Sequence, residues 1–192
     1  MALHSLKPRE QVIWAGVLVA LSIGSTLTIA CAAPLAAFAA AAALTLTPRG
    51  AFAASGAVWL ANQSVGFSIL HYPLAPDTFF WGLALGAVTL LAAWAAVSVL
   101  ERVKLSPAMA ATAAFFGAFA VYEGSLFLIS AGSGSGIADY TVAIVSRIFT
   151  VNAAAFAALF LLHRLCALAR ASQRREPRMD TSGNKTSPAI AG

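Results

Sequence analysis

Charged residues are scarce in this chain of 192 residues. Asp, Glu, Lys and Arg make up 10% of it, whereas hydrophobic residues make up 60% and the mean hydropathy is +0.82. About a quarter of the residues in a soluble domain are charged. The composition therefore excludes an ordinary soluble enzyme or binding domain, and it predicts an integral membrane protein.

Cysteine and the common catalytic motifs are scarce as well. The two cysteines, Cys31 and Cys166, are predicted at opposite membrane faces, so we expect no disulfide within one chain. The sequence contains no CxxC, no HExxH and no GxxxxGK[ST] motif. We therefore expect no enzyme activity, no ATP site and no cofactor of the protein's own. Any ATP-driven process would depend on other subunits.

The chain does contain six apolar blocks, most of them near the roughly 20 residues that cross a bilayer as a helix. These blocks are 11–31, 34–47, 51–70, 79–100, 106–130 and 140–168. They predict an all-α fold with six transmembrane helices in residues 1–170, and a disordered tail at 171–192. The second block is short and rich in alanine, which also fits a tilted or partly interfacial helix. A cleaved signal sequence ending near Ala30-Cys31 is an alternative that leaves the other spans unchanged.

The basic residues predict the orientation of these helices. With six spans, eleven of the twelve lie on one side, which we take as the cytoplasm: Lys7, Arg9, Arg49, Arg102, Lys104, Arg164, Arg170, Arg174, Arg175, Arg178 and Lys185. Both termini are then cytoplasmic, in a multi-pass protein of the inner (plasma) membrane. The basic tail is better explained by contact with membrane lipid than by nucleic-acid binding.

The twelfth basic residue, Arg147, is predicted inside the last helix, about eight residues or roughly 12 Å from its outer end. A charge at that depth normally faces protein or a water-filled cavity. Glu123 in the fifth helix, and the adjacent amides Asn62 and Gln63 in the third, are predicted at a similar depth. We therefore expect these four residues to form one polar layer in the outer half of the membrane.

Helical spacing extends this layer into a candidate binding site. Ser55, Trp59, Asn62 and Gly66 share one face of the third helix, because they are spaced by four, three and four residues. An outer rim adds polar and aromatic residues: His71, Tyr72, Asp77, Asp139 and Tyr140. Aromatic walls, amides, a cation and carboxylates suit a water-soluble organic ligand.

Two features allow a purely structural interpretation. Arg147 and Glu123 could pair only to lock two helices together, with the amides bonding across the interface. Gly16, Ala20 and Gly24 repeat every four residues in the first helix, which allows close approach of another helix. That helix could belong to this chain or to a separate membrane subunit.

The segment WLANQSVGFSILHYP at 59–73, the FFWG at 79–82 and the lone arginine of the last helix resemble the BtuM family of cobalamin transporters. That family is of the type of the substrate-binding subunits of energy-coupling-factor vitamin transporters. The resemblance implies capture of cobalamin or another corrinoid from outside by Trp59, Asn62, Gln63, Tyr72, Glu123, Tyr140 and Arg147. It also implies a transmembrane coupling subunit docked on the stripe of Gly16, Ala20 and Gly24.

The chain departs from that family at one position. Some members use a cysteine near the outer end of this region as an axial cobalt ligand, and no cysteine stands there in this sequence. His71 lies at about the right place, and imidazole is a good ligand for transition metals, so we hypothesise His71 as the cobalt ligand. The alternative function is a scaffold or assembly factor that transports nothing, in which the polar layer only locks helices.

Overall fold

The computed structural model describes residues 7–29 and 33–173. This part of the chain contains six α-helices, one short 3-10 helix and no strand. The elements are α1 (Pro8–Ile29), α2 (Leu35–Thr45), α3 (Pro48–Ser68), α4 (Pro76–Arg102), α5 (Pro107–Ser133), η2 (Ile137–Asp139) and α6 (Val142–Gln173). The all-α prediction is confirmed, and each expected block matches one helix. The predicted cleavage position at Ala30-Cys31 and the tail from residue 174 lie outside the described residues.

Local sequence signals explain where the helices begin and end. Proline opens α3, α4 and α5, where its missing N–H costs nothing. The hydroxyl of Thr47 accepts a hydrogen bond from the Gly50 N–H at 3.3 Å and caps α3. At the end of α5, Gly134 adopts a positive φ of 69°, which glycine permits without strain.

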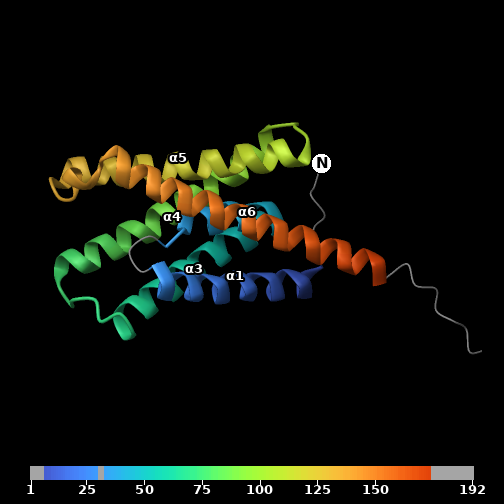
Figure 1. Ribbon diagram of the computed structural model, residues 1–192, viewed down its shortest axis with the longest axis horizontal. Helices are drawn as coiled ribbons and strands as arrows, with labels where there is room; N and C mark the ends of the chain where they lie inside the picture. Colours follow the sequence, from blue (N-terminus) through green and yellow to red (C-terminus); the bar gives the residue numbers. More distant parts are fainter. Residues whose placement is uncertain (1–6, 30–32, 174–192) are drawn as a thin grey trace, which may run out of the picture.

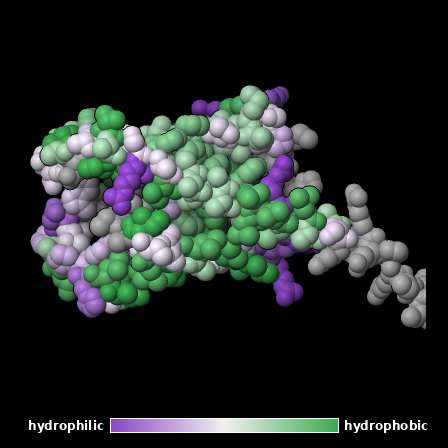
Figure 2. Space-filling model, in the orientation of Figure 1, coloured by the Kyte–Doolittle hydropathy of each residue, from purple (hydrophilic) through white to green (hydrophobic). Residues whose placement is uncertain are grey.

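Four helices of the described chain, α1, α4, α5 and α6, are long and apolar enough to cross a membrane. Helix α3 has 21 residues but is more polar, and α2 has 11 residues, which is about 16 Å of helix against a hydrocarbon core of roughly 30 Å. On the face drawn in Figure 2, apolar residues cover the middle of the molecule and hydrophilic residues gather toward its two ends. The chain is therefore a helical protein with at least four candidate membrane spans.

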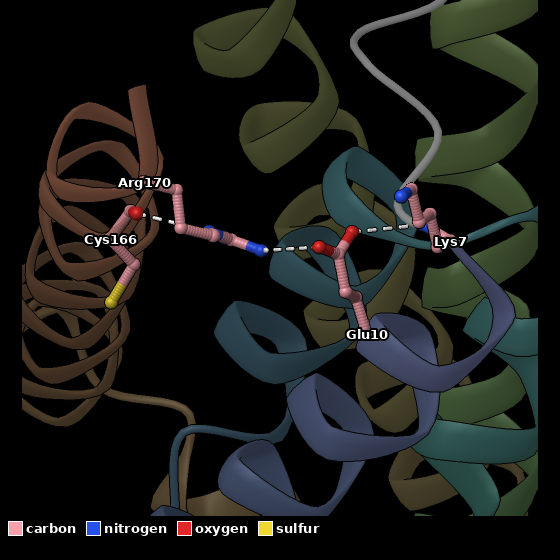
Figure 3. Close-up of polar contacts among 4 residues, drawn as sticks. All are labelled: Lys7, Glu10, Cys166 and Arg170. Atoms are coloured by element: carbon pink, nitrogen blue, oxygen red, sulfur yellow. Dashed lines mark hydrogen bonds and ion pairs between the residues drawn. The ribbon is translucent and has the colours of Figure 1, made fainter. Parts of the chain in front are cut away.

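The two ends of the bundle differ in what they carry (Figure 1). The α3–α4 loop and the α5–α6 connection lie together at one end, which we call the loop end. The opposite end, which we call the basic end, holds the start of α1 and the end of α6. An ion pair of 3.6 Å between Arg170 and Glu10 joins these two helix ends (Figure 3). The backbone N–H of Lys7 also donates to Glu10, and the Arg170 Nε donates to the carbonyl of Cys166.

Helix α2 occupies the centre of the bundle. All eleven of its residues are buried, and α1, α3, α4, α5 and α6 pack around it. The alanine-rich sequence explains this position, since small side chains let five helices approach one short segment. Along its whole length α2 therefore packs against other helices, and Leu44 and Thr45 at its end are each only 8% exposed.

Candidate functional site

Helix α3 turns its predicted polar stripe inward. Ser55 is fully buried, Asn62 is 5% exposed and Gly66 is buried, while Trp59 is half-buried. These four positions therefore share an inward face, as their spacing predicts.

A cavity of about 170 Å³ lies where this stripe approaches the loop end. Three predicted site residues line it, namely Asn62, Gln63 and Tyr72. The remaining lining residues come from the segment before α2 and from α2, α4 and α5: Ala33, Leu35, Thr78, Trp81, Gly82, Leu85 and Tyr122. The sequence analysis missed Tyr122 and Trp81, which give the cavity two aromatic groups beyond the predicted set.

Two glycines of α4 bring α3 close enough to form this wall. A Cβ added at Gly82 would lie 2.6 Å from Oε1 of Gln63, and one at Gly86 would lie 2.5 Å from Cε2 of Trp59. The indole Nε1 of Trp59 donates a hydrogen bond of 2.8 Å to the carbonyl of Gly82. Trp59 thus binds α4 from the predicted site region without lining the cavity itself.

The amide pair that breaks the apolar character of α3 forms a short hydrogen-bond chain. Asn62 Nδ2 donates to the hydroxyl of Thr26 in α1 at 3.0 Å, and Gln63 Nε2 donates to Asn62 Oδ1 at 3.2 Å. Thr26 is fully buried and donates in turn to the carbonyl of Ser22 at 2.9 Å. Asn62 therefore links two helices, while Gln63 lies nearer the open space.

The α3–α4 loop places the two predicted rim residues differently. The Tyr72 ring packs on Gly66, where a Cβ would collide with it, and the Tyr72 N–H donates to the Gly66 carbonyl at 3.0 Å. His71 is exposed and has a φ of 54°, which turns the chain sharply before Tyr72. Among the described residues, no group of three or more His, Cys, Asp or Glu side chains could hold a metal ion.

Glu123 is buried, with 8% of its surface exposed, and its Oε1 has no hydrogen-bond partner among the described residues. The neighbouring Tyr122 lines the cavity, whereas Glu123 does not. The expected ion pair with Arg147 is absent, since the ion pair of the described chain joins Arg170 and Glu10. Glu123 is thus a buried carboxyl group that lies beside the cavity and lacks the predicted cation.

The prediction of a buried Arg147 is wrong, because Arg147 is exposed. Helix α6 faces the bundle with Phe149, Asn152, Phe156 and Leu159, and at about 100° per residue Arg147 lies roughly 200° around the helix from Phe149. The distances from the helix ends also differ from the expected eight residues, since Arg147 is five residues from the start of α6 and Glu123 is ten residues from the end of α5.

Tyr140 lies in the α5–α6 connection, outside the cavity lining. Its ring contacts Phe127 edge-on at 5.3 Å between centroids. Burial and the nearby Glu123 carboxylate raise the pKa of the Tyr140 hydroxyl, while a hydrogen bond with Ser130 lowers it. The phenol therefore stays protonated at neutral pH and belongs to the rim rather than to the cavity.

Asn152 of α6 is a buried polar residue that the sequence analysis did not select. Its Oδ1 accepts a hydrogen bond of 3.1 Å from the Ala37 N–H in the first turn of α2, and its Nδ2 donates to the Ile148 carbonyl. The start of α2 lies at the cavity, because Ala33 and Leu35 line it. The bond from Ala37 to Asn152 therefore fixes the start of α2 beside the cavity lining.

The small-residue stripe of α1 faces away from the bundle. Gly16, Ala20 and Gly24 are exposed, and a Cβ added at either glycine would meet nothing within 4 Å. Helix α1 packs inward through another face, formed by Trp14, Leu18, Ser22 and Thr26. The stripe is therefore not a contact within the described chain.

No protein-family model matches the chain, and neither a curated protein nor a solved structure matches it. The resemblance to cobalamin transporters therefore stays a hypothesis that rests on the sequence segments quoted above.

Proposed function

We propose that the protein is a membrane-embedded binding and uptake protein for a water-soluble organic molecule, which it takes up at the loop end. In this proposal all six helices belong to the membrane domain, both termini are cytoplasmic, and the loop end faces outward from the inner membrane. The excess of basic residues at the opposite end supports that orientation.

The observation that carries the proposal is the composition of the cavity. The cavity brings two amide side chains, two tyrosines and a tryptophan together between helices that are otherwise largely apolar. Such a mixture of aromatic walls and few polar groups is typical of small-molecule sites.

Cobalamin or another corrinoid is the more specific form of the proposal. A corrinoid is far larger than a cavity of about 170 Å³, and drug-sized ligands already occupy pockets of roughly 300–1,000 Å³. The bulk of a corrinoid would therefore lie at the mouth, beside the exposed His71, with only an edge group entering. Of the other expected site residues, Glu123 is buried, Tyr140 packs on Phe127 of α5, and Arg147 is exposed on α6.

Ligand-dependent stability tests the proposal. A true ligand at about a hundred times its Kd stabilises the folded protein by roughly 2.7 kcal/mol, which raises the temperature of unfolding in detergent. Molecules that co-purify with the protein should be identified by mass spectrometry and then added back. Gln63→Leu should abolish the shift, whereas Ser64→Ala, on the exposed side of the same helix turn, should preserve it.

Spectral titration with cobalamin tests the corrinoid form separately. If His71 coordinates cobalt, the spectrum of the bound corrinoid should change in the wild type and not in His71→Ala. Identical bound spectra would eliminate axial coordination, and absence of binding in both would eliminate the corrinoid.

The scaffold alternative also has a specific observation in its favour. Trp59, Asn62 and Asn152 all use their polar groups to join helices. A scaffold would bind its partner through an exposed surface, for which the stripe of Gly16, Ala20 and Gly24 is the candidate. In the uptake proposal the same stripe would dock a transmembrane coupling subunit. A scaffold shows no stabilisation by any small molecule, so the unfolding experiment separates the two functions.

A further inference from the structure

A second hollow lies on the outside of the bundle, between α1 and α3, and it is unrelated to the cavity at the loop end. These two helices run side by side in the same direction (Figure 1). The hollow is a groove of about 390 Å³. Its walls carry small or slender side chains: Val12, Ala15 and Val19 from α1, and Gly50, Ala53 and Ala57 from α3. It is therefore a narrow apolar channel on the surface that faces the membrane.

The groove begins at the basic end and covers only part of the span. A hydrogen bond joins the two helices at its start, where Oε1 of Gln11 accepts from the Thr47 hydroxyl at 3.2 Å, and both residues line the groove. From Pro8 to Val19 the lining covers eleven residue steps, or about 16 Å of helix, which is close to half of a hydrocarbon core of roughly 30 Å. A transmembrane helix would need the full thickness, whereas one acyl chain of one leaflet needs half of it.

Two cations stand at the start of the groove. Arg9 precedes Val12 by three residues, and Arg49 precedes Ala53 by four, so each lies on the helix face that leads into the groove. Both are exposed, and within the described chain neither has a carboxylate at ion-pair distance. The nearby Glu10 is held by Arg170 instead. The groove therefore leads from a positive site at the interface into an apolar channel.

We propose that this groove binds an anionic phospholipid of the leaflet at the basic end. One acyl chain lies between α1 and α3, and the guanidinium groups of Arg9 and Arg49 hold the phosphodiester. The charge of the entrance, the apolar lining and the length of one leaflet together select this occupant over a helix of a partner or a second copy.

The test uses the full chain, delipidated in detergent, with phosphatidylglycerol and phosphatidylcholine of identical acyl chains as probes. Native mass spectrometry counts the retained lipid, and thermal unfolding reports the stabilisation. We expect phosphatidylglycerol to be retained in preference to phosphatidylcholine. The double variant R9Q/R49Q should weaken its retention about thirtyfold, since each basic residue near an anionic surface contributes roughly a factor of five.

Matched variants separate the groove from a general surface effect. Arg102→Gln removes an exposed cation from the same end but away from the groove, and it should leave retention unchanged. Ala53→Leu fills the groove and should displace the lipid, whereas Ala120→Leu, at an exposed position of α5, should not. Because Arg9, Arg49 and Ala53 are all exposed, these variants should fold like the wild type.

Several results would overturn the proposal. Equal retention of the two lipids would show that the headgroup charge does not determine which lipid binds. If Arg102→Gln weakened retention of phosphatidylglycerol as much as R9Q/R49Q does, the attraction would come from the whole basic end and not from the groove. Stabilisation by glycerol phosphate alone would show a headgroup site that does not use the groove. Self-association that Ala53→Leu abolishes and lipid leaves unchanged would show that a second copy occupies the groove.

Discussion

Two apolar regions of the bundle carry polar side chains: α3 where it contacts α4, and the first turns of α6. The polar side chains point inward in the first region and outward in the second. On α3, Trp59, Asn62 and Gln63 turn inward because α4 presents Gly82 and Gly86, and because Thr26 of α1 accepts the Asn62 amide. On α6, Arg147 turns outward, since Phe149 and Asn152 occupy the inward face. A polar group in a membrane helix is therefore buried when its neighbours supply space and a hydrogen-bond partner, and otherwise it moves to the surface.

The largest effect is expected where this space is removed. Gly86→Leu places a side chain into the Trp59 ring and should destabilise the fold by about 3 kcal/mol, at the upper end of the usual cost of overpacking. Thermal unfolding in detergent measures the loss. Gly124→Leu, at an exposed position of α5 with nothing within 4 Å, is the control. Adding Trp59→Ala to Gly86→Leu should recover stability. If Gly86→Leu is harmless, α4 does not hold α3 in the way described.

The second effect concerns the capped start of α2. Asn152→Leu leaves the Ala37 N–H without its partner in a buried site, which should cost about 2 kcal/mol. The same unfolding measurement applies. Thr150→Ala changes an exposed residue of the same helix and should have little effect. Equal losses in the two variants would show that the bond to Ala37 contributes nothing specific.

A third and smaller effect is expected from the contact between α1 and α3. The hydrogen bond between Asn62 and Thr26 should be worth about 1 kcal/mol, because such bonds inside membrane proteins average roughly 0.6 and reach about 1.7 kcal/mol. A double-mutant cycle with Asn62→Ala and Thr26→Val isolates this energy. If the two changes are additive, the side chains do not interact, and the inward position of Asn62 needs another cause.

The smallest effect is expected at Arg147. Arg147→Gln should change stability by less than about 0.5 kcal/mol, because the side chain is exposed and makes no ion pair in the described chain. It should also leave any ligand-induced shift of the unfolding temperature intact. A loss as large as that of Asn62→Ala would reverse the comparison and return Arg147 to the polar site.

The sequence predicted the helices well, because hydrophobic blocks and proline starts are local signals. The predicted and observed bounds agree within a few residues, although α6 continues to Gln173, past the predicted boundary at residue 171. The inward stripe of α3 was also predictable from its spacing. These features depend on a single segment at a time.

The predictions that were wrong depend on how several helices pack together. The direction in which Arg147 points follows from which face of α6 meets α2 and α5, whereas the polar layer was inferred from depth alone. Thr26 and Asn152 resemble ordinary helix residues that bond their own backbone, and both do so. Only the arrangement in space shows that each also serves a neighbouring helix. Likewise, the short block 34–47 gave no sign that its helix would be enclosed on every side.

The enclosure of α2 has a consequence for how the chain matures in the membrane. The hydrogen bond that completes its first turn is accepted by Asn152 of α6, which follows Ala37 by 115 residues in the chain. Until α6 arrives, the Ala37 amide has no Asn152 to accept it, and hydrocarbon offers none. Packing of α6 is therefore the step that satisfies this amide, and a chain truncated before α6 should be more sensitive to proteolysis than the full chain.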